Sequence, residues 1–84
     1  MEAMMNNALL QRIAVDPRVM AWKPVIFGTR VPVDLIVRRV AQGIPEQEIL
    51  REYSRLTVQD IRAALTYAAA VVAHEDVFPM PVMA

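Results

Sequence analysis

A chain of 84 residues with equal numbers of acidic and basic side chains and no cysteine can form one small domain but not two. The lack of cysteine excludes a disulfide framework and a thiolate metal site. The formal net charge of zero disfavours nucleic-acid binding by the surface as a whole and leaves only a local basic patch for that role.

The hydrophobic content indicates self-association. Hydrophobic residues make up 56% of the chain, which is more than a monomer of this size readily buries, and neutral charge causes little repulsion between copies. We therefore expect a homodimer whose interface extends the core. An alanine-rich monomer is the alternative, because alanine raises the hydrophobic fraction without requiring burial.

The sequence does not predict a membrane segment. No apolar run approaches the roughly 20 residues that span a bilayer. Residues 1–7 lack the basic start and the continuous apolar stretch of a signal peptide. We therefore expect a cytoplasmic protein.

The N-terminal part of the chain is expected to form short strands after a disordered start at residues 1–9. Within residues 10–32, the alternation of Leu10–Val15 predicts a first strand that ends at an Asp-Pro pair. The β-branched run Val25–Phe27 predicts a second strand, which resumes at residues 30–31 after a turn.

Two prolines limit how these strands can pair. Pro24 and Pro32 lack the N–H group that a central strand needs, so their strands are expected at an edge. A sheet this short is not stable alone. It must rest on the helices or be completed by a second copy of the chain, and the second option fits the expected homodimer.

Three helices are predicted within residues 33–76. Their expected bounds are about 33–42, 45–53 and 58–74. Gly43 supplies a stop for the first helix, and Thr57 with Asp60 resembles a capping box at the start of the third. Helical spacing predicts a buried face on the first helix, formed by Val33, Ile36, Val37, Val40 and Ala41. The buried face predicted for the third helix consists of Val58, Ile61, Leu65, Ala68 and Val72, widened by Ala64, Ala69 and Val71.

Residues 77–84 are predicted to be an extended apolar tail, because this segment contains two prolines. Such a tail is expected to lie against a partner or against its own core. The residues assigned to partner contact are Val77, Phe78, Met80 and Val82. The chain as a whole is predicted to be a single α+β domain, mainly α, with short N-terminal strands ahead of three helices.

Several blocks occur in a characteristic order. Arg-Ile-x-x-Asp-Pro-x-Val begins at Arg12, and Lys-Pro-Val-Ile-x-Gly-Thr-Arg-Val-Pro-Val begins at Lys23. A helix ending in Gln-Gly, a short glutamate-rich helix and Asp-Ile-Arg-Ala-Ala-Leu-x-Tyr-Ala-Ala from Asp60 follow. This order, over about residues 12–74, resembles the bacterial domain-of-unknown-function 433 family.

The resemblance implies a function. Members of that family are regarded as small homodimers with a helix-turn-helix-like part and are commonly assigned as VapB-type antitoxins of PIN-like nuclease toxins. The chain departs from the family pattern at Ala21 and Trp22, where a glycine pair is usual, and at Phe27, where arginine is frequent. These apolar replacements favour burial of the loop at an interface over polar contacts.

The second and third helices have the layout of a helix-turn-helix, joined by residues 54–56. Spacing alone favours a small helical domain with solvated arginines, and the resemblance adds DNA binding as an expectation. The candidate DNA-binding residues, which supply donors for phosphates and base edges, are Arg38, Arg39, Arg51, Arg55, Gln59 and Arg62.

The corner between the strands and the first helix is assigned a structural role. It consists of Gly28, Thr29, Arg30 and Pro32. Thr29 is expected to satisfy backbone groups, and Arg30 to pair with Asp34 or Asp16; contact with DNA phosphate or a partner chain is the alternative for Arg30.

Catalysis finds little support in the sequence. His74 is the single histidine, and it stands near the expected end of a helix beside Glu75 and Asp76, which rarely converge on one ion without other ligands. No glycine-rich phosphate loop and no nucleophile–base pairing is visible. We expect no enzyme, no cofactor and no metal.

The function that we expect is that of an antitoxin, which binds a PIN-like toxin through its tail and third helix and binds operator DNA as a homodimer. The alternative is a dimerisation or protein-interaction module without a DNA-binding role. Neutral charge and the alanine-rich third helix favour this alternative.

Overall fold

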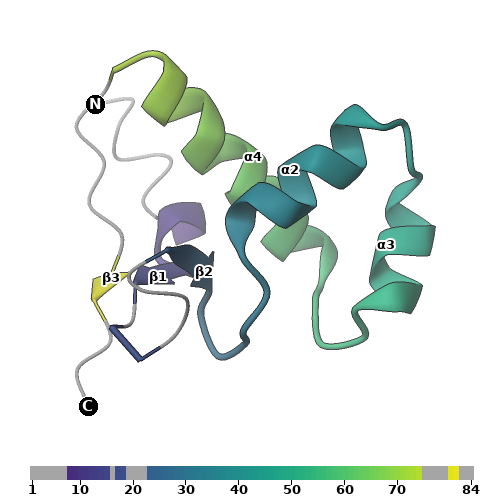
Figure 1. The fold of residues 1–84 in the computed structure, drawn as a ribbon, viewed down its shortest axis with the longest axis horizontal. Helices are drawn as coiled ribbons and strands as arrows, with labels where there is room; N and C mark the ends of the chain where they lie inside the picture. Colours follow the sequence, from purple (N-terminus) through teal and green to yellow (C-terminus); the bar gives the residue numbers. More distant parts are fainter. Residues whose placement is uncertain (1–7, 16, 19–22, 75–79, 82–84) are drawn as a thin grey trace.

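The computed structural model describes residues 8–15, 17–18, 23–74 and 80–81. Figure 1 shows a small sheet at one end of the molecule and three helices beside it. The prediction of an α+β domain, mainly helical, with short N-terminal strands ahead of the helices, is confirmed. The elements in chain order are β1 (Ile13–Val15), β2 (Pro24–Ile26), α2 (Val33–Ala41), α3 (Glu46–Glu52), α4 (Val58–Val72) and β3 (Met80–Pro81).

The sheet pairs a strand from the N-terminal part of the chain with one from its C-terminal part. β1 is the middle strand and pairs antiparallel with β2, with Ile13 opposite Ile26. It also pairs in parallel with β3, with Ala14 opposite Met80. All three strands belong to the same chain, and β3 comes from its C-terminal segment.

The first strand is shorter than its alternating pattern predicts. Residues 8–10 are helical, and the Arg12 N–H donates to the Leu9 carbonyl oxygen at 2.9 Å. Pairing therefore begins at Ile13 and not at Leu10. Residues 8 and 9, which were expected to be disordered, belong to this helical turn, and residues 1–7 lie outside the described part of the chain.

The helices begin and end where local chemistry predicts. Gly43, with φ of 82°, terminates α2 in a conformation that favours glycine. Pro45 is the N-terminal cap residue of α3, where its missing N–H costs nothing. α4 begins with the predicted capping box, in which Thr57 and Asp60 satisfy each other's backbone N–H groups.

The core joins the sheet to all three helices. Each of the five elements from β1 to α4 contributes one isoleucine whose exposure is 1% or less, and α2 packs most extensively against α4. Burial of a side chain of this size stabilises a fold by about 1.5–3 kcal/mol. The five isoleucines are Ile13, Ile26, Ile36, Ile49 and Ile61.

One carboxylate connects the start of α4 to the chain before β1. Asp60 is 6% exposed, and its Oδ1 accepts a hydrogen bond from Arg12 Nη1 at 3.1 Å. Its Oδ2 accepts from the Thr57 backbone N–H at 2.9 Å, and the Thr57 hydroxyl accepts from the Asp60 N–H at 3.3 Å. The negative charge also lies at the positive end of the helix dipole. Asp60 is therefore both a cap and a tertiary ion-pair partner.

The prediction for the buried face of α4 was largely wrong. Of the predicted face only Ile61 and Ala64 are fully buried, whereas Val58, Leu65, Ala69, Val71 and Val72, which also belong to it, are exposed. α4 instead turns a face of small residues toward the core, and Ala63 and Ala64 have 0% exposure. This orientation follows from the close packing of α2 on α4 and from the buried position of Asp60. Ala41 of α2, also expected inside, is exposed at the end of its helix.

Among the residues that the structure describes, no helix has the length and apolar character needed to cross a bilayer.

The capping box yields a stability prediction. Replacing Thr57 with alanine removes the hydroxyl that accepts the Asp60 N–H, so the free energy of unfolding should fall by about 1 kcal/mol in urea titrations. Thr57→Ser keeps a hydroxyl acceptor in place and is the matched control, and its free energy of unfolding should change by only about a few tenths of a kcal/mol. Equal stability of the Thr57→Ala variant and the unmodified chain would contradict the assignment of the cap.

Candidate nucleic-acid and partner interface

α3 and α4 are two helices joined by a short connection, which is the order that the sequence predicts for a helix-turn-helix-like unit. Residues 53–57 connect the two helices, and Ile49 of α3 and Ile61 of α4 anchor them in the common core. The connection is bent at Tyr53, and the Tyr53 carbonyl oxygen accepts a hydrogen bond from the Leu56 N–H at 3.0 Å. This geometry leaves the outer sides of α3 and of the start of α4 exposed.

Four of the predicted DNA-binding residues are exposed in this unit, three of them on the helices and Arg55 in the connection. Within the described part of the chain, none of their side chains forms an ion pair or hydrogen bond with another protein group. Their donors are therefore available to an anionic partner. The four are Arg51, Arg55, Gln59 and Arg62.

The predicted Arg38–Arg39 pair is divided between two surfaces. The Arg38 side chain is 75% exposed, and its guanidinium lies 3.7 Å from Asp34. Arg39 instead faces α3, where it donates to Glu52 at 3.0 Å and lies 6.0 Å from the centre of the Tyr53 ring. Placing Arg39 on the outer face was wrong, because its guanidinium links α2 to α3. Only Arg38 retains an outward position.

Thr29 has the backbone-bonding role that the sequence suggests. Its hydroxyl donates to the Ile26 carbonyl oxygen at 2.8 Å and accepts from the Val31 N–H at 3.0 Å. Gly28 has φ of 83°, which a residue with a side chain adopts only with strain. The strand predicted at residues 30–31 is reduced to a single bridge, between Val25 and Pro32.

Of the two ion-pair partners expected for Arg30, Asp34 is not used. Asp34 is instead bonded by Lys23 at 3.2 Å and approached by Arg38 at 3.7 Å. Asp16, the other expected partner, lies outside the described residues. Arg30 is exposed and is part of the groove described next.

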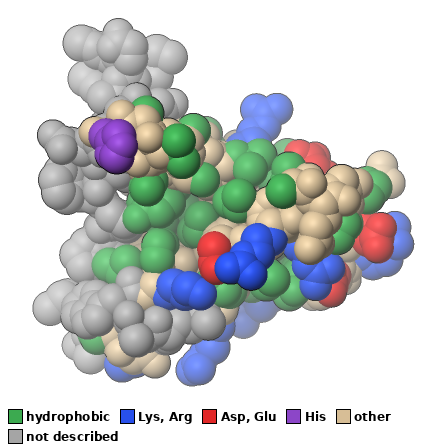
Figure 2. Space-filling model, turned by 45° about the horizontal axis from the view of Figure 1, so that its top comes forward, with side chains coloured by type: hydrophobic (Ala, Val, Ile, Leu, Met, Phe, Trp, Pro, Cys, Tyr) green, Lys and Arg blue, Asp and Glu red, His purple; other side chains and the backbone are tan. Residues whose placement is uncertain are grey.

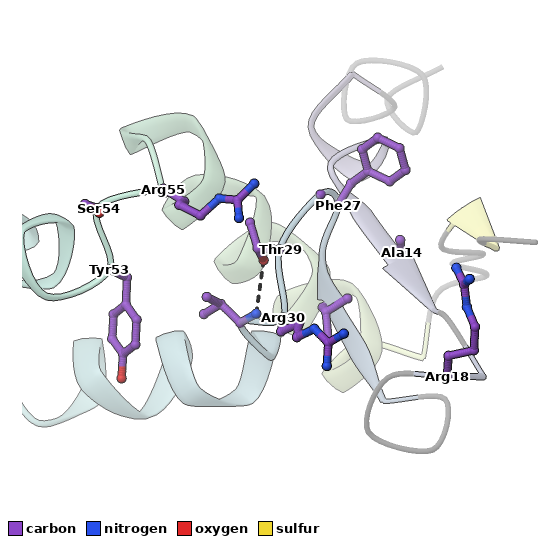
Figure 3. A pocket seen from close by; sticks show the side chains of 11 residues that line it. Ala14, Arg18, Phe27, Thr29, Arg30, Tyr53, Ser54 and Arg55 are labelled. Carbon is purple, nitrogen blue, oxygen red and sulfur yellow. Dashed lines mark hydrogen bonds between the residues drawn. The ribbon is translucent and has the colours of Figure 1, made fainter. Parts of the chain in front are cut away.

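An open groove of about 800 Å³ separates this corner from the α3–α4 connection. Its described lining contains arginines and no carboxylate. Figure 3 shows Arg55 extending from the connection toward Thr29, with Arg30 and the Phe27 ring extending from the corner. The groove is lined by Ala14, Arg18, Val25, Phe27, Gly28, Thr29, Arg30, Val31, Tyr53, Ser54 and Arg55.

The sequence did not predict this groove as a site. Its walls come from three segments that are distant in the chain, around residues 14–18, 25–31 and 53–55. Only the fold brings the three arginines together, and no motif spacing connects them. Phe27, which was expected to be buried at an interface, is 58% exposed on the single chain.

A second candidate surface runs along α4. We define the apolar face of α4 as Val58, Leu65, Ala69 and Val72, each of which is exposed, with Val72 at 78%. Figure 2 shows hydrophobic side chains gathered on the surface next to His74, which follows α4. Beside this face lies a polar edge, which we define as Gln59, Arg62 and Thr66. On the buried side of α4, desolvation raises the pKa of Tyr67 above its ordinary value.

The predicted tail and the His74 region are described only in part. Met80 lies in β3 beside β1, whereas Val77, Phe78 and Val82 lie outside the described residues. His74 is exposed with φ of 62°, in the turn that follows α4. Its neighbours Glu75 and Asp76 also lie outside the described part of the chain. Among the described residues, no group of three potential metal ligands is found.

The fold and these surfaces define a small α+β domain with a helix-turn-helix-like unit and an exposed helix face. The family model described as "Protein of unknown function (DUF433)" matches residues 13–68, more than half of the chain. The chain therefore belongs to the DUF433 family. An uncharacterized protein from Archaeoglobus fulgidus is 59% identical over 29 residues, which cover 34% of this chain and 81% of that protein. No solved structure is significantly similar to the chain.

Proposed function

We propose that the chain is an antitoxin-type regulator: a cytoplasmic homodimer without catalytic activity that binds a toxin protein and operator DNA. The observation that carries the proposal is the apolar face of α4, whose residues are exposed to solvent on the single chain. The same helix begins at the helix-turn-helix-like connection. The proposal thus places protein contacts and DNA contacts on neighbouring sides of one helix.

The apolar face has the geometry of a helix–helix contact. Val58, Leu65 and Val72 recur at intervals of seven residues and form one line along the helix. Ala69 lies in the same line, and its small side chain permits close approach of a second helix. The line spans about 21 Å, at a rise of about 1.5 Å per residue. Its burial against a second copy would add hydrophobic area that an 84-residue domain lacks.

Toxin binding is proposed for the C-terminal side of the molecule. Val71, which is not part of the apolar face of α4, is 48% exposed at the end of this helix, and the sequence continues into the apolar residues 77–84. An apolar segment next to an exposed apolar helix end can provide a continuous surface for a protein partner. The resemblance to VapB-type antitoxins suggests a PIN-like nuclease as that partner.

DNA binding is proposed for the start of α4 and the end of α3. Gln59 and Arg62 on the polar edge have donors suited to base edges and phosphates, and Arg51 and Arg55 lie before α4 on the same exposed unit. Arg38, exposed on α2, would add a phosphate contact. A homodimer would present two such units at a fixed spacing.

A protein-interaction module without DNA binding is the second candidate. It is favoured by Val58, an exposed apolar residue in the first turn of α4, where a groove-reading helix presents polar side chains. The formal net charge of zero also favours it. Self-association through the apolar face is common to both candidates.

Self-association is tested by a charge placed in the apolar face. We expect the purified chain to be a dimer by light scattering, and Leu65→Asp to be monomeric while it keeps its helical circular dichroism. Gln47→Asp adds the same charge on exposed α3 and should remain dimeric. A monomeric starting protein, or a Leu65→Asp variant that is still dimeric, would refute the interface.

The antitoxin function is tested by co-expression with the protein encoded next to this chain, followed by a gel-shift assay on the upstream DNA at two salt concentrations. A stable complex is expected, and Arg62→Gln should reduce the salt dependence of DNA binding by about 0.9 per lost phosphate contact. Gln59→Ala should alter sequence preference. Failure to form a complex argues against an antitoxin, and complex formation without DNA binding supports the second candidate.

A further inference from the structure

The groove between the corner and the α3–α4 connection contains Arg30 and Phe27, which belong neither to the apolar face of α4 nor to the side chains proposed to bind operator DNA. We propose that it binds an unpaired nucleotide, with the phosphate held by the arginines that line the groove and the base against Phe27. The nucleotide can be free or part of a single strand, since both carry the same phosphate and base. This proposal does not depend on the antitoxin function or on operator binding.

The charge of the groove selects anions. Arg55 extends from the connection toward Thr29, Arg30 extends from the corner, and Arg18 also belongs to a described lining that contains no carboxylate. Arg30 and Arg55 have no ion-pair partner within the described residues. A guanidinium presents its donors as a planar fork, which matches the oxygens of a phosphate.

Phe27 distinguishes a nucleotide from a simple anion. Its ring is 58% exposed at the rim, although the adjoining Val25 and Ile26 are at least 98% buried. Exposed aromatic rings beside basic grooves are the surfaces on which unpaired bases stack. The volume of about 800 Å³ also accommodates a ligand of nucleotide size.

The hydrogen bonds of the corner disfavour an extended peptide. The outer edge of β2 is already occupied, because the Ile26 N–H donates to the Val31 carbonyl oxygen at 3.0 Å and Val25 bridges to Pro32. The Thr29 hydroxyl is bonded to two backbone groups. A peptide would therefore find few partners for its main chain, whereas a nucleotide needs only the guanidinium donors and the ring.

The test measures binding of labelled oligothymidylate to the full chain by fluorescence anisotropy at two salt concentrations. Phe27→Leu, which keeps an apolar side chain but removes the ring, should weaken binding by about tenfold. Arg30→Gln should weaken binding and lower the salt slope by about 0.7. Gln47→Glu makes the same change in charge on α3, outside the groove, and should be close to the unmodified chain.

Competition experiments distinguish a free nucleotide from a single strand, and both of these from an acidic peptide or a duplex. Full competition by a mononucleotide supports a site for the free ligand, and weak competition with tight oligothymidylate binding supports a single strand. An acidic peptide that competes equally, or tighter binding of the duplex form, would overturn the proposal. So would the absence of binding, or Phe27→Leu and Arg30→Gln variants that bind as tightly as Gln47→Glu.

Discussion

The hydrogen-bonded carboxylate of Asp60 is the constraint on which the arrangement of this domain depends. It holds the Thr57 N–H at the start of α4 and the Arg12 guanidinium ahead of β1, two groups separated by more than forty residues of sequence. A buried carboxylate is costly without such partners, and here the cap and the ion pair both supply them. The sheet and the helical unit are thereby fixed relative to each other.

The position of Asp60 at the start of α4 determines which face of this helix is exposed to binding partners. With Asp60 turned inward, α4 buries Ile61 and its alanines and leaves Val58, Leu65 and Val72 outside. The Arg39–Glu52 pair holds α3 against α2 and thus sets the position of the connection that carries Arg55. The proposed dimer contact, the DNA-binding side chains and the arginine groove are consequences of these two polar links and of the isoleucine core.

Local chemistry in the sequence was sufficient to predict most of the elements. The capping box, Gly43 and Pro45 each act within a few residues, so the bounds of the three helices were predictable. The rotation of α4 was not, because hydrophobic spacing ranks valine and leucine above alanine, whereas close packing on α2 selects the smaller side chain. The inward position of Arg39 depends on Glu52, which no periodicity reveals.

The candidate site was predictable only on the helix-turn-helix-like unit. Arg51, Gln59 and Arg62 follow from the exposed sides of two predicted helices, and Arg55 from the predicted connection between them. The groove requires three segments to converge, which is a property of the tertiary fold. Membership of the DUF433 family was evident from the order of the blocks, because a fixed succession of turns and helix starts leaves a specific pattern in the sequence.

The role of Asp60 in joining the sheet to the helices is tested most directly by a double-mutant cycle of Arg12→Gln and Asp60→Asn in urea. We predict a coupling energy of about 1 kcal/mol, because the ion pair is partly buried, with side-chain exposures of 43% and 8%. Additive effects of the two substitutions, with no measurable coupling, would contradict it.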